Sequence, residues 1–197
     1  MERKDMSYRA RTRVCRAMAD PNAGILLEEI AEKKPQVFVQ SVNTAYLAAQ
    51  LCETYKNFDG DPDELVMAAL LHDVGMLQVP DEVLLKHGRL SDSELAVVRA
   101  HVPAGIEMLK DVGFGGLVLD AAEYHHERSD GTGYPKGCES PSIPRCAKIV
   151  LVCDIYEALT TDRPQRKAFN MYEATALMRE MPVSSAILQS LRRCDDT

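Results

Sequence analysis

The segment LVMAALL at residues 65–71 is apolar throughout. Asp61 and Pro62 precede it, and an aspartate N-cap followed by proline is a typical helix start. A helix that is apolar on every side has to be buried. This one leads directly into His72 and Asp73. The chain must therefore fold so that a histidine and a carboxylate emerge from a buried helix.

Most of the remaining sequence has the apolar spacing or the end signals of α-helices. Ser91 and Glu94, three residues apart, have the pattern of a capping box. Further helices are predicted at residues 42–55, 91–109, 117–126, 172–180 and 184–192. A loop is predicted at residues 127–142, which are rich in glycine, proline and serine.

The segment at residues 145–162 allows two interpretations. Its β-branched run IVLV, residues 149–152, fits a buried strand as well as a buried helix. No partner strand is evident elsewhere in the sequence, which favours the helix. The predicted fold class is therefore all-α.

The length and composition are those of a globular domain. The chain has 197 residues, of which 46% are hydrophobic, enough for one domain with its own core. The first 35 residues are more highly charged and contain none of the candidate site residues. We therefore predict an N-terminal helical extension at residues 1–35 and one domain at residues 36–197.

Charge and cysteine content exclude several classes of function. The net charge of −7 argues against a nucleic-acid or anionic-membrane binder, because phosphate surfaces recruit basic proteins. No apolar run approaches the roughly 20 residues of a membrane span, and the charged N-terminus lacks the apolar core of a signal peptide. We expect a cytoplasmic protein. The six cysteines form no CxxC pair, which predicts reduced, mostly buried thiols and no cysteine zinc site.

Four of the five histidines lie beside an acid, beside another histidine or within an apolar helix: His72, His101, His125 and His126. Any one of them alone would be read most simply as a satisfied core residue. Asp154 lies within the apolar string IVLVCDIYEAL, where its structural explanation would be a hydrogen bond between helices. The set as a whole is harder to explain by structure alone.

A metal ion would account for the buried acid. Burying Asp73 without a partner would cost several kcal/mol, and a divalent ion would satisfy it. Histidine and carboxylate ligands without cysteine suit iron, manganese or zinc. The sequence therefore predicts a metal centre at His72 and Asp73.

Four stretches together resemble a known family: HDVGMLQVPDEVLLKHGRLSDSEL from residue 72, then His101, then HHERSDGTGYPKG from residue 125, then IPRCAKIVLVCDIYEALTTDRPQRKAF from residue 143. In this order they closely resemble the HD-GYP domain, a branch of the HD phosphohydrolase superfamily, over residues 36–190. The tripeptide Gly133-Tyr134-Pro135 is the GYP signature itself.

The resemblance implies an HD-domain helical bundle of the HD-GYP type with two or three divalent ions, usually iron or manganese. It implies hydrolysis of the cyclic dinucleotide c-di-GMP or of a related cyclic dinucleotide. The metal ligands that it implies are His72, Asp73, His101, His125, His126 and Asp154. Asp73 would bridge two ions, which makes it the candidate catalytic residue.

The resemblance also implies how substrate is held. Arg163 and Arg166 match positions that bind substrate phosphate, and arginine forks suit phosphate oxygens. The loop with Gly133, Tyr134 and Pro135 would line the site and, in this family, contacts diguanylate cyclase (GGDEF) partners. Two ions about 3.5–4 Å apart can lower the pKa of a bridging water and stabilise charge on the phosphate.

The sequence departs from the family at three positions. Gln40 stands where the family has a histidine, and Gln36 where members with a third ion have a glutamate. Residues four apart share a helix face, so this face offers only neutral amides. We expect one weakened metal position and no third ion. Met76 replaces a lysine thought to stabilise or protonate the leaving group, and losing such an acid costs about 10²–10⁴ in rate.

These departures leave two main hypotheses. One is a c-di-GMP phosphodiesterase that activates water with two ions. The other is a degenerate HD-GYP domain that binds a ligand or a partner protein with little or no turnover. An HD-type enzyme acting on another phosphoester is a third, weaker alternative.

Overall fold

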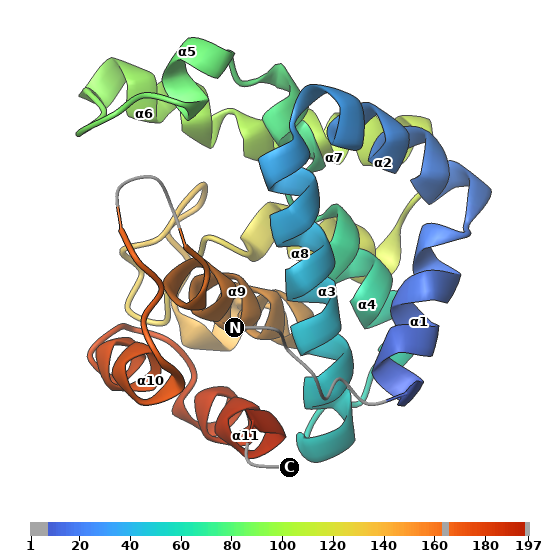
Figure 1. The fold of residues 1–197 in the computed structure, drawn as a ribbon, viewed down its shortest axis with the longest axis vertical. Coiled ribbons are helices and arrows are strands. Elements are labelled where there is room, and N and C mark those ends of the chain that lie inside the picture. Colours follow the sequence, from blue (N-terminus) through green and yellow to red (C-terminus); the bar gives the residue numbers. More distant parts are fainter. Residues whose placement is uncertain (1–7, 163–165, 196–197) are drawn as a thin grey trace.

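The computed structural model describes residues 8–162 and 166–195, and these residues form helices and loops without a β-strand (Figure 1). This confirms the predicted all-α class. The helices are α1 (Tyr8–Met18), α2 (Pro21–Lys33), α3 (Pro35–Thr54), α4 (Pro62–Leu71), η1 (Val74–Gln78), α5 (Asp81–Leu84), α6 (Asp92–Arg99), α7 (His101–Asp111), α8 (Gly116–Tyr124), η2 (Ser140–Ser142), α9 (Arg145–Thr160), α10 (Met171–Arg179) and α11 (Ser185–Asp195).

Helix α4 begins as the sequence predicts. The Asp61 side chain accepts a hydrogen bond from the backbone N–H of Asp63, and Pro62 is the first helical residue. The residues from Leu65 to Leu71 are buried except for Met67. The long helix α3 and helix α8 pack against α4. Burial on all sides explains why this helix has no polar face.

Helix α9 settles the ambiguity at residues 145–162. It is helical from Arg145 to Thr160, so the run IVLV forms a buried helix and no strand. It packs against α3 and α8, and these helices with α4 enclose the core (Figure 1). A β-branched run can form a helix when tertiary burial outweighs its local preference.

The helix predicted at residues 91–109 is in fact two helices. The capping box at Ser91 and Glu94 is present and opens α6, but α6 ends at Arg99 and α7 begins at His101. Pro103 explains the break, because proline lacks the N–H that would bond to the Arg99 carbonyl and its ring clashes there. The prediction of one continuous helix was wrong at this point, and the break places His101 at a helix start.

The N-terminal segment packs on the rest of the chain. Ala10 and Val14 of α1 are fully buried and belong to the same core as the residues of α4. Lys34 separates α2 from α3, and its ammonium group donates to the Val79 carbonyl at 2.7 Å. The domain boundary at residue 35 stays a prediction.

The sequence led to one expectation for the cysteines and another for membrane-spanning segments. All six cysteines are free, but only Cys146 and Cys153 are buried and Cys15 is exposed, so the expectation of mostly buried thiols was wrong. Within the described ranges, no helix is both long and apolar enough to cross a membrane.

A close contact between Gly75 and Gly105 brings η1 against α7. A Cβ atom at Gly75 would lie 1.9 Å from the carbonyl oxygen of His101 and 2.6 Å from the backbone nitrogen of Gly105. Backbone atoms cannot yield as a flexible side chain can. The glycine therefore lets the chain after Asp73 approach the helix that carries His101.

We expect Gly75→Ala to lower the free energy of unfolding by about 3 kcal/mol, the upper end of the usual cost of overpacking. Gly24→Ala is the matched control, because Gly24 lies within α2 and a Cβ atom there would have no atom within 4 Å. That change should stabilise the protein by about 0.5–1 kcal/mol. Urea unfolding of both variants measures the difference, and equal stability of the two would contradict this account.

Candidate metal centre

Three helix ends and one helix face supply the candidate ligands. His72 follows the last residue of α4 and Asp73 comes next, while His101 is the first residue of α7. His125 is the C-cap of α8, and His126 follows it. Asp154 alone projects from within a helix, α9. Helix ends allow adjacent residues to face one point, which the 100° step inside a helix prevents.

Asp73 lies among three histidine rings. Its Oδ1 atom is 3.3 Å from His101 Nε2 and 3.4 Å from His125 Nε2. Its Oδ2 atom is 3.5 Å from His72 Nε2. The Asp73 residue is only 5% exposed, so water does not solvate this carboxylate freely. The predicted proximity of these side chains is therefore present.

The backbone fixes the orientation of three of the rings. His72 Nδ1 lies 2.8 Å from the Ala69 carbonyl oxygen, and His101 Nδ1 lies 2.6 Å from the Val98 carbonyl oxygen. His125 Nδ1 lies 3.0 Å from the Ala121 carbonyl oxygen. A carbonyl only accepts, so each Nδ1 carries a proton, and in a neutral ring Nε2 then presents its lone pair to the centre. This second contact is typical of metal-bound histidine.

The donor atoms fit a divalent ion. Asp73, His101, His125 and His126 offer ligand atoms that all lie within 4.8 Å of one another. Buried polar atoms are normally hydrogen-bonded, yet within the described part of the chain the Nε2 atoms of His72 and of these three histidines have no hydrogen-bond partner, and neither has Asp73 Oδ1. Ions with bonds of about 2.0–2.2 Å to nitrogen and oxygen would satisfy all of them.

The protonation states suit ligation at the four-residue group. Burial lowers the pKa of His101, and burial and the neighbouring His125 lower the pKa of His126 well below its usual value. Burial opposes the charge on Asp73, but His72 and the other rings hold the pKa of this carboxyl well below its usual range. Metal ligands have to be deprotonated, and these shifts favour the deprotonated forms of all three residues.

His72 differs from the other rings. Burial lowers its pKa, but Asp73 and Asp154 outweigh burial and raise the pKa to about 9. Its Nε2 atom is 3.8 Å from Asp154 Oδ1. Without an ion, a proton on His72 therefore balances two carboxylates, and an ion that binds there takes the place of that proton.

Gln40 lies beside Asp154, one of the candidate ligands. Its Nε2 group donates to Asp154 Oδ1 over 2.6 Å, which joins α3 to α9. A carboxylate only accepts, so the amide nitrogen has to face Asp154 and directs positive hydrogen toward the place where an ion would bind. Gln36, one turn earlier in α3, is exposed. The structural explanation for Asp154, a bond between helices, is thus present beside its contact with His72.

The GYP loop packs directly on the candidate ligands. The Tyr134 ring stacks on His126, with 4.5 Å between centroids and 23° between planes. Gly133 makes this possible, because a Cβ atom there would lie 2.5 Å from the Glu127 Cα atom and from the His126 carbonyl oxygen.

Glu127 organises the same loop, and the sequence reasoning missed it. Its residue is fully buried, and its Oε1 accepts from the N–H groups of Lys136 at 2.6 Å and Gly137 at 3.1 Å. Its Oε2 accepts from the N–H group of Cys138 at 2.9 Å. A glutamate in a polar, glycine-rich segment reads as solvated. The signal that could have found it is its place directly after His126.

Neither of the two predicted phosphate-binding arginines is seen in contact with a candidate metal ligand among the described residues. Arg163 lies outside the described residues. Arg166 donates to the carbonyl oxygens of Ala158 at 2.6 Å and Leu159 at 3.0 Å, near the end of α9. Its guanidinium also lies over the Phe169 ring, 4.6 Å from the centroid. A phosphate-binding role for either arginine stays a prediction.

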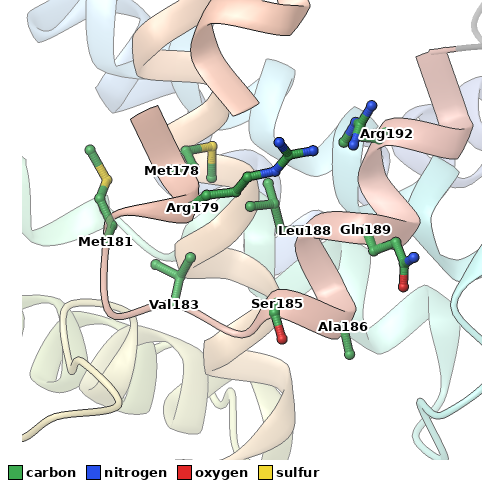
Figure 2. Close-up of a pocket in the computed structure, with 9 residues that line it drawn as sticks. All are labelled: Met178, Arg179, Met181, Val183, Ser185, Ala186, Leu188, Gln189 and Arg192. Atoms are coloured by element: carbon green, nitrogen blue, oxygen red, sulfur yellow. The ribbon is translucent and has the colours of Figure 1, made fainter. Parts of the chain in front are cut away.

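A separate cavity lies between α10 and α11, away from these residues. Figure 2 shows its lining, with Arg179 and Arg192 at one side and Met178 and Leu188 beside them. Its volume is about 440 Å³, and no candidate metal ligand lines it. The chemistry suggested by the sequence is therefore at the histidine cluster and not in this cavity.

Comparison with known proteins agrees with the geometry. A family model described as HD domain matches residues 25–186. The chain is 39% identical to cyclic di-GMP phosphodiesterase PA4108 of Pseudomonas aeruginosa, over 81% of this chain and 39% of that protein. It is 31% identical to 3'3'-cGAMP-specific phosphodiesterase 1 of Vibrio cholerae, over 79% of this chain and 36% of that protein. The chain thus spans less than half the length of these relatives.

Solved structures share the fold. Bd1817, described as an HDG"Y"P protein from Bdellovibrio bacteriovorus, aligns with a TM-score of 0.68 at 21% identity, over 95% of this chain and 61% of that one. The HD domain of L. monocytogenes phosphodiesterase PgpH, in complex with cyclic-di-AMP, aligns with a TM-score of 0.64 at 18% identity, over 87% and 93%. With the histidine cluster and the GYP loop in place, the chain belongs to the HD domain family and to its HD-GYP branch.

Proposed function

We propose that this domain is a metal-dependent phosphodiesterase that hydrolyses a cyclic dinucleotide, with c-di-GMP as its substrate. The observation that carries the proposal is the set of unpartnered Nε2 atoms around the buried Asp73 carboxylate. The names of the relatives, which act on cyclic di-GMP or 3'3'-cGAMP, support the substrate class.

The proposed cofactor is a pair of iron or manganese ions. Asp73, His101, His125 and His126 would hold one ion, and His72 and Asp154 would hold the other, with Asp73 shared between them. Such ions lower the pKa of water and stabilise charge on a phosphate during an in-line displacement. The first ion would have four ligand residues that lie close together. At the position of the second ion, the Gln40 amide donates a hydrogen bond to the ligand Asp154. We therefore propose unequal affinities for the two ions.

The protein's own residues perform the positioning. The Ala69, Val98 and Ala121 carbonyls hold three rings so that Nε2 faces Asp73. Tyr134 covers His126 on one side and restricts access of water to this ligand. Glu127 holds the backbone that follows the GYP tripeptide. Pre-organised ligands of this kind keep the reacting groups in place without rearrangement.

One observation favours the degenerate alternative. Gln40 donates a hydrogen bond to Asp154 Oδ1, and Met76 cannot donate a proton to a leaving group. A domain with one ion and no acid could bind cyclic dinucleotide and signal through a partner without turnover. Contact of the GYP loop with GGDEF proteins, and location in the cytoplasm, stay predictions.

A metal and turnover measurement tests the proposal. The protein is purified with Mn²⁺ or Fe²⁺, bound metal is quantified, and c-di-GMP and 3'3'-cGAMP are each followed by chromatography. We expect two ions per chain and linear formation of product from c-di-GMP. One ion or none, without product, would favour the degenerate domain. Turnover of 3'3'-cGAMP alone would refute the choice of substrate but not the reaction.

A further inference from the structure

We propose that Arg99 binds a phosphate group of the substrate at the edge of the metal centre. The inference rests on the proposed function, because it assigns a second contact to the same ligand. Arg99 is the last residue of α6, directly before the break that places His101 at the centre.

Contacts with Tyr134 place Arg99 beside the candidate ligands. The Arg99 guanidinium carbon lies over the Tyr134 ring, 4.9 Å from its centroid. The same ring stacks on His126 at 4.5 Å and meets His101 edge-on at 6.5 Å. One tyrosine therefore connects the guanidinium to two candidate metal ligands. Arg99 also lowers the pKa of the Tyr134 hydroxyl, although burial raises that pKa more strongly.

The guanidinium of Arg99 is available to a ligand. Its side chain is exposed, and no hydrogen bond or carboxylate partner of it occurs among residues 8–162 and 166–195. A contact between a guanidinium and an aromatic ring engages no hydrogen-bond acceptor, so the N–H groups of Arg99 can still donate to a ligand. Two of these N–H groups can bind two phosphate oxygens at once.

Arg166 provides the contrast. Its guanidinium donates to the carbonyls of Ala158, Leu159 and Lys167, so its donors already hold the end of α9 and the chain after it. Arg99 has the same chemistry without these bonds. Of these two arginines, only Arg99 is seen in contact with a residue of the centre.

The charge of the ligand explains why such a cation is needed. A cyclic dinucleotide carries two phosphodiester charges, and the ions at the centre can neutralise only the one that reacts there. The chain has a net charge of −7, with Asp73 and Asp154 in the centre. Tyr134 lies between Arg99 and the candidate ligand His126. Arg99 is therefore placed to pair with the phosphate that does not react at the ions.

Binding measurements on three substitutions test the role. The probe is a phosphorothioate analogue of c-di-GMP that resists hydrolysis, bound to Mn²⁺-loaded protein and measured by calorimetry. Arg99→Met keeps apolar packing on Tyr134 but removes the charge, and should weaken binding about 10- to 100-fold. Arg99→Lys keeps the charge without the fork and should weaken it less. Bound Mn²⁺ and melting temperature should not change in either.

Arg193→Ala is the control, because Arg193 lies on α11, far from α6 in Figure 1. It should bind the analogue as the wild type does. Wild-type affinity in Arg99→Met would overturn the role of Arg99, because packing on Tyr134 alone would then suffice. If the wild-type protein fails to bind the analogue, the proposed substrate is wrong and the role of Arg99 falls with it.

Discussion

Replacement of Asp73 by asparagine should remove metal binding and phosphodiesterase activity together. The carboxylate is the one group that lies within 3.5 Å of His72, His101 and His125 among the described residues. Asparagine keeps the size of the side chain but removes its negative charge. Because metal activation contributes several kcal/mol to such reactions, we expect turnover to fall by about a thousandfold or more.

The stability of the same variant separates metal binding from folding. A ligand present at 100 times its dissociation constant stabilises a protein by about 2.7 kcal/mol. Chelation of the metal should therefore lower the melting temperature of the wild type but leave that of Asp73→Asn unchanged. Asp111→Asn is the control, because Asp111 is exposed at the end of α7.

Two results would contradict this account of Asp73. Wild-type metal content in Asp73→Asn would show that the ions bind elsewhere. A wild-type protein whose melting temperature ignores chelation would show that the buried cluster is a structural feature without an ion. Asp111→Asn should match the wild type in metal content, turnover and response to chelation.

Two kinds of sequence signal, a local helix pattern and an ordered family motif, pointed to the residues that the structure brings close to His72 and Asp73. His72 and Asp73 follow an apolar segment whose N-cap and proline are adjacent to it, and the structure has that helix from Pro62 to Leu71. His101, His125 and Asp154 were assigned through the family resemblance, and all three lie within 3.8 Å of a residue of the pair. Local patterns and an ordered motif were enough to bring these residues together.

The features that were missed depend on contacts between distant parts of the chain or on competing local signals. The bond from Gln40 to Asp154 joins residues 114 positions apart, and no periodicity indicates which atom of the amide faces the acid. Glu127 reads as a loop acid because its burial depends on how residues 136–138 return. The break before His101 was visible in Pro103, but the apolar spacing on both sides concealed it.

Replacement of Gln40 by histidine should raise the affinity for the second ion. The amide nitrogen of Gln40 now donates to Asp154 Oδ1 at 2.6 Å, so a donor occupies the position that a ligand would need. A neutral imidazole presents a lone pair instead and releases Asp154 to bind the ion. We expect the ion count to rise toward two per chain at limiting Mn²⁺, with magnetic coupling between paired ions in electron paramagnetic resonance.

Asn43→His is the matched control for this change. Asn43 lies one turn along α3 from Gln40, and its amide donates to Glu157 Oε1 at 2.9 Å, again across to α9. Asn43 therefore resembles Gln40 in lying on α3 and in donating an amide hydrogen bond to a carboxylate of α9. The carboxylate that it contacts, Glu157, is not a candidate metal ligand. Asn43→His should leave the ion count and the magnetic coupling unchanged.

Combining Gln40→His with Met76→Lys tests whether these two positions limit turnover. Met76 is partly buried and packs against the core, so it offers neither a charge nor a proton. A lysine there supplies a cation for the leaving group, and loss of such an acid costs about 10²–10⁴ in rate. The double variant should turn over c-di-GMP faster than either single variant. A second ion without faster turnover in the double variant would refute the claim that these two positions limit turnover.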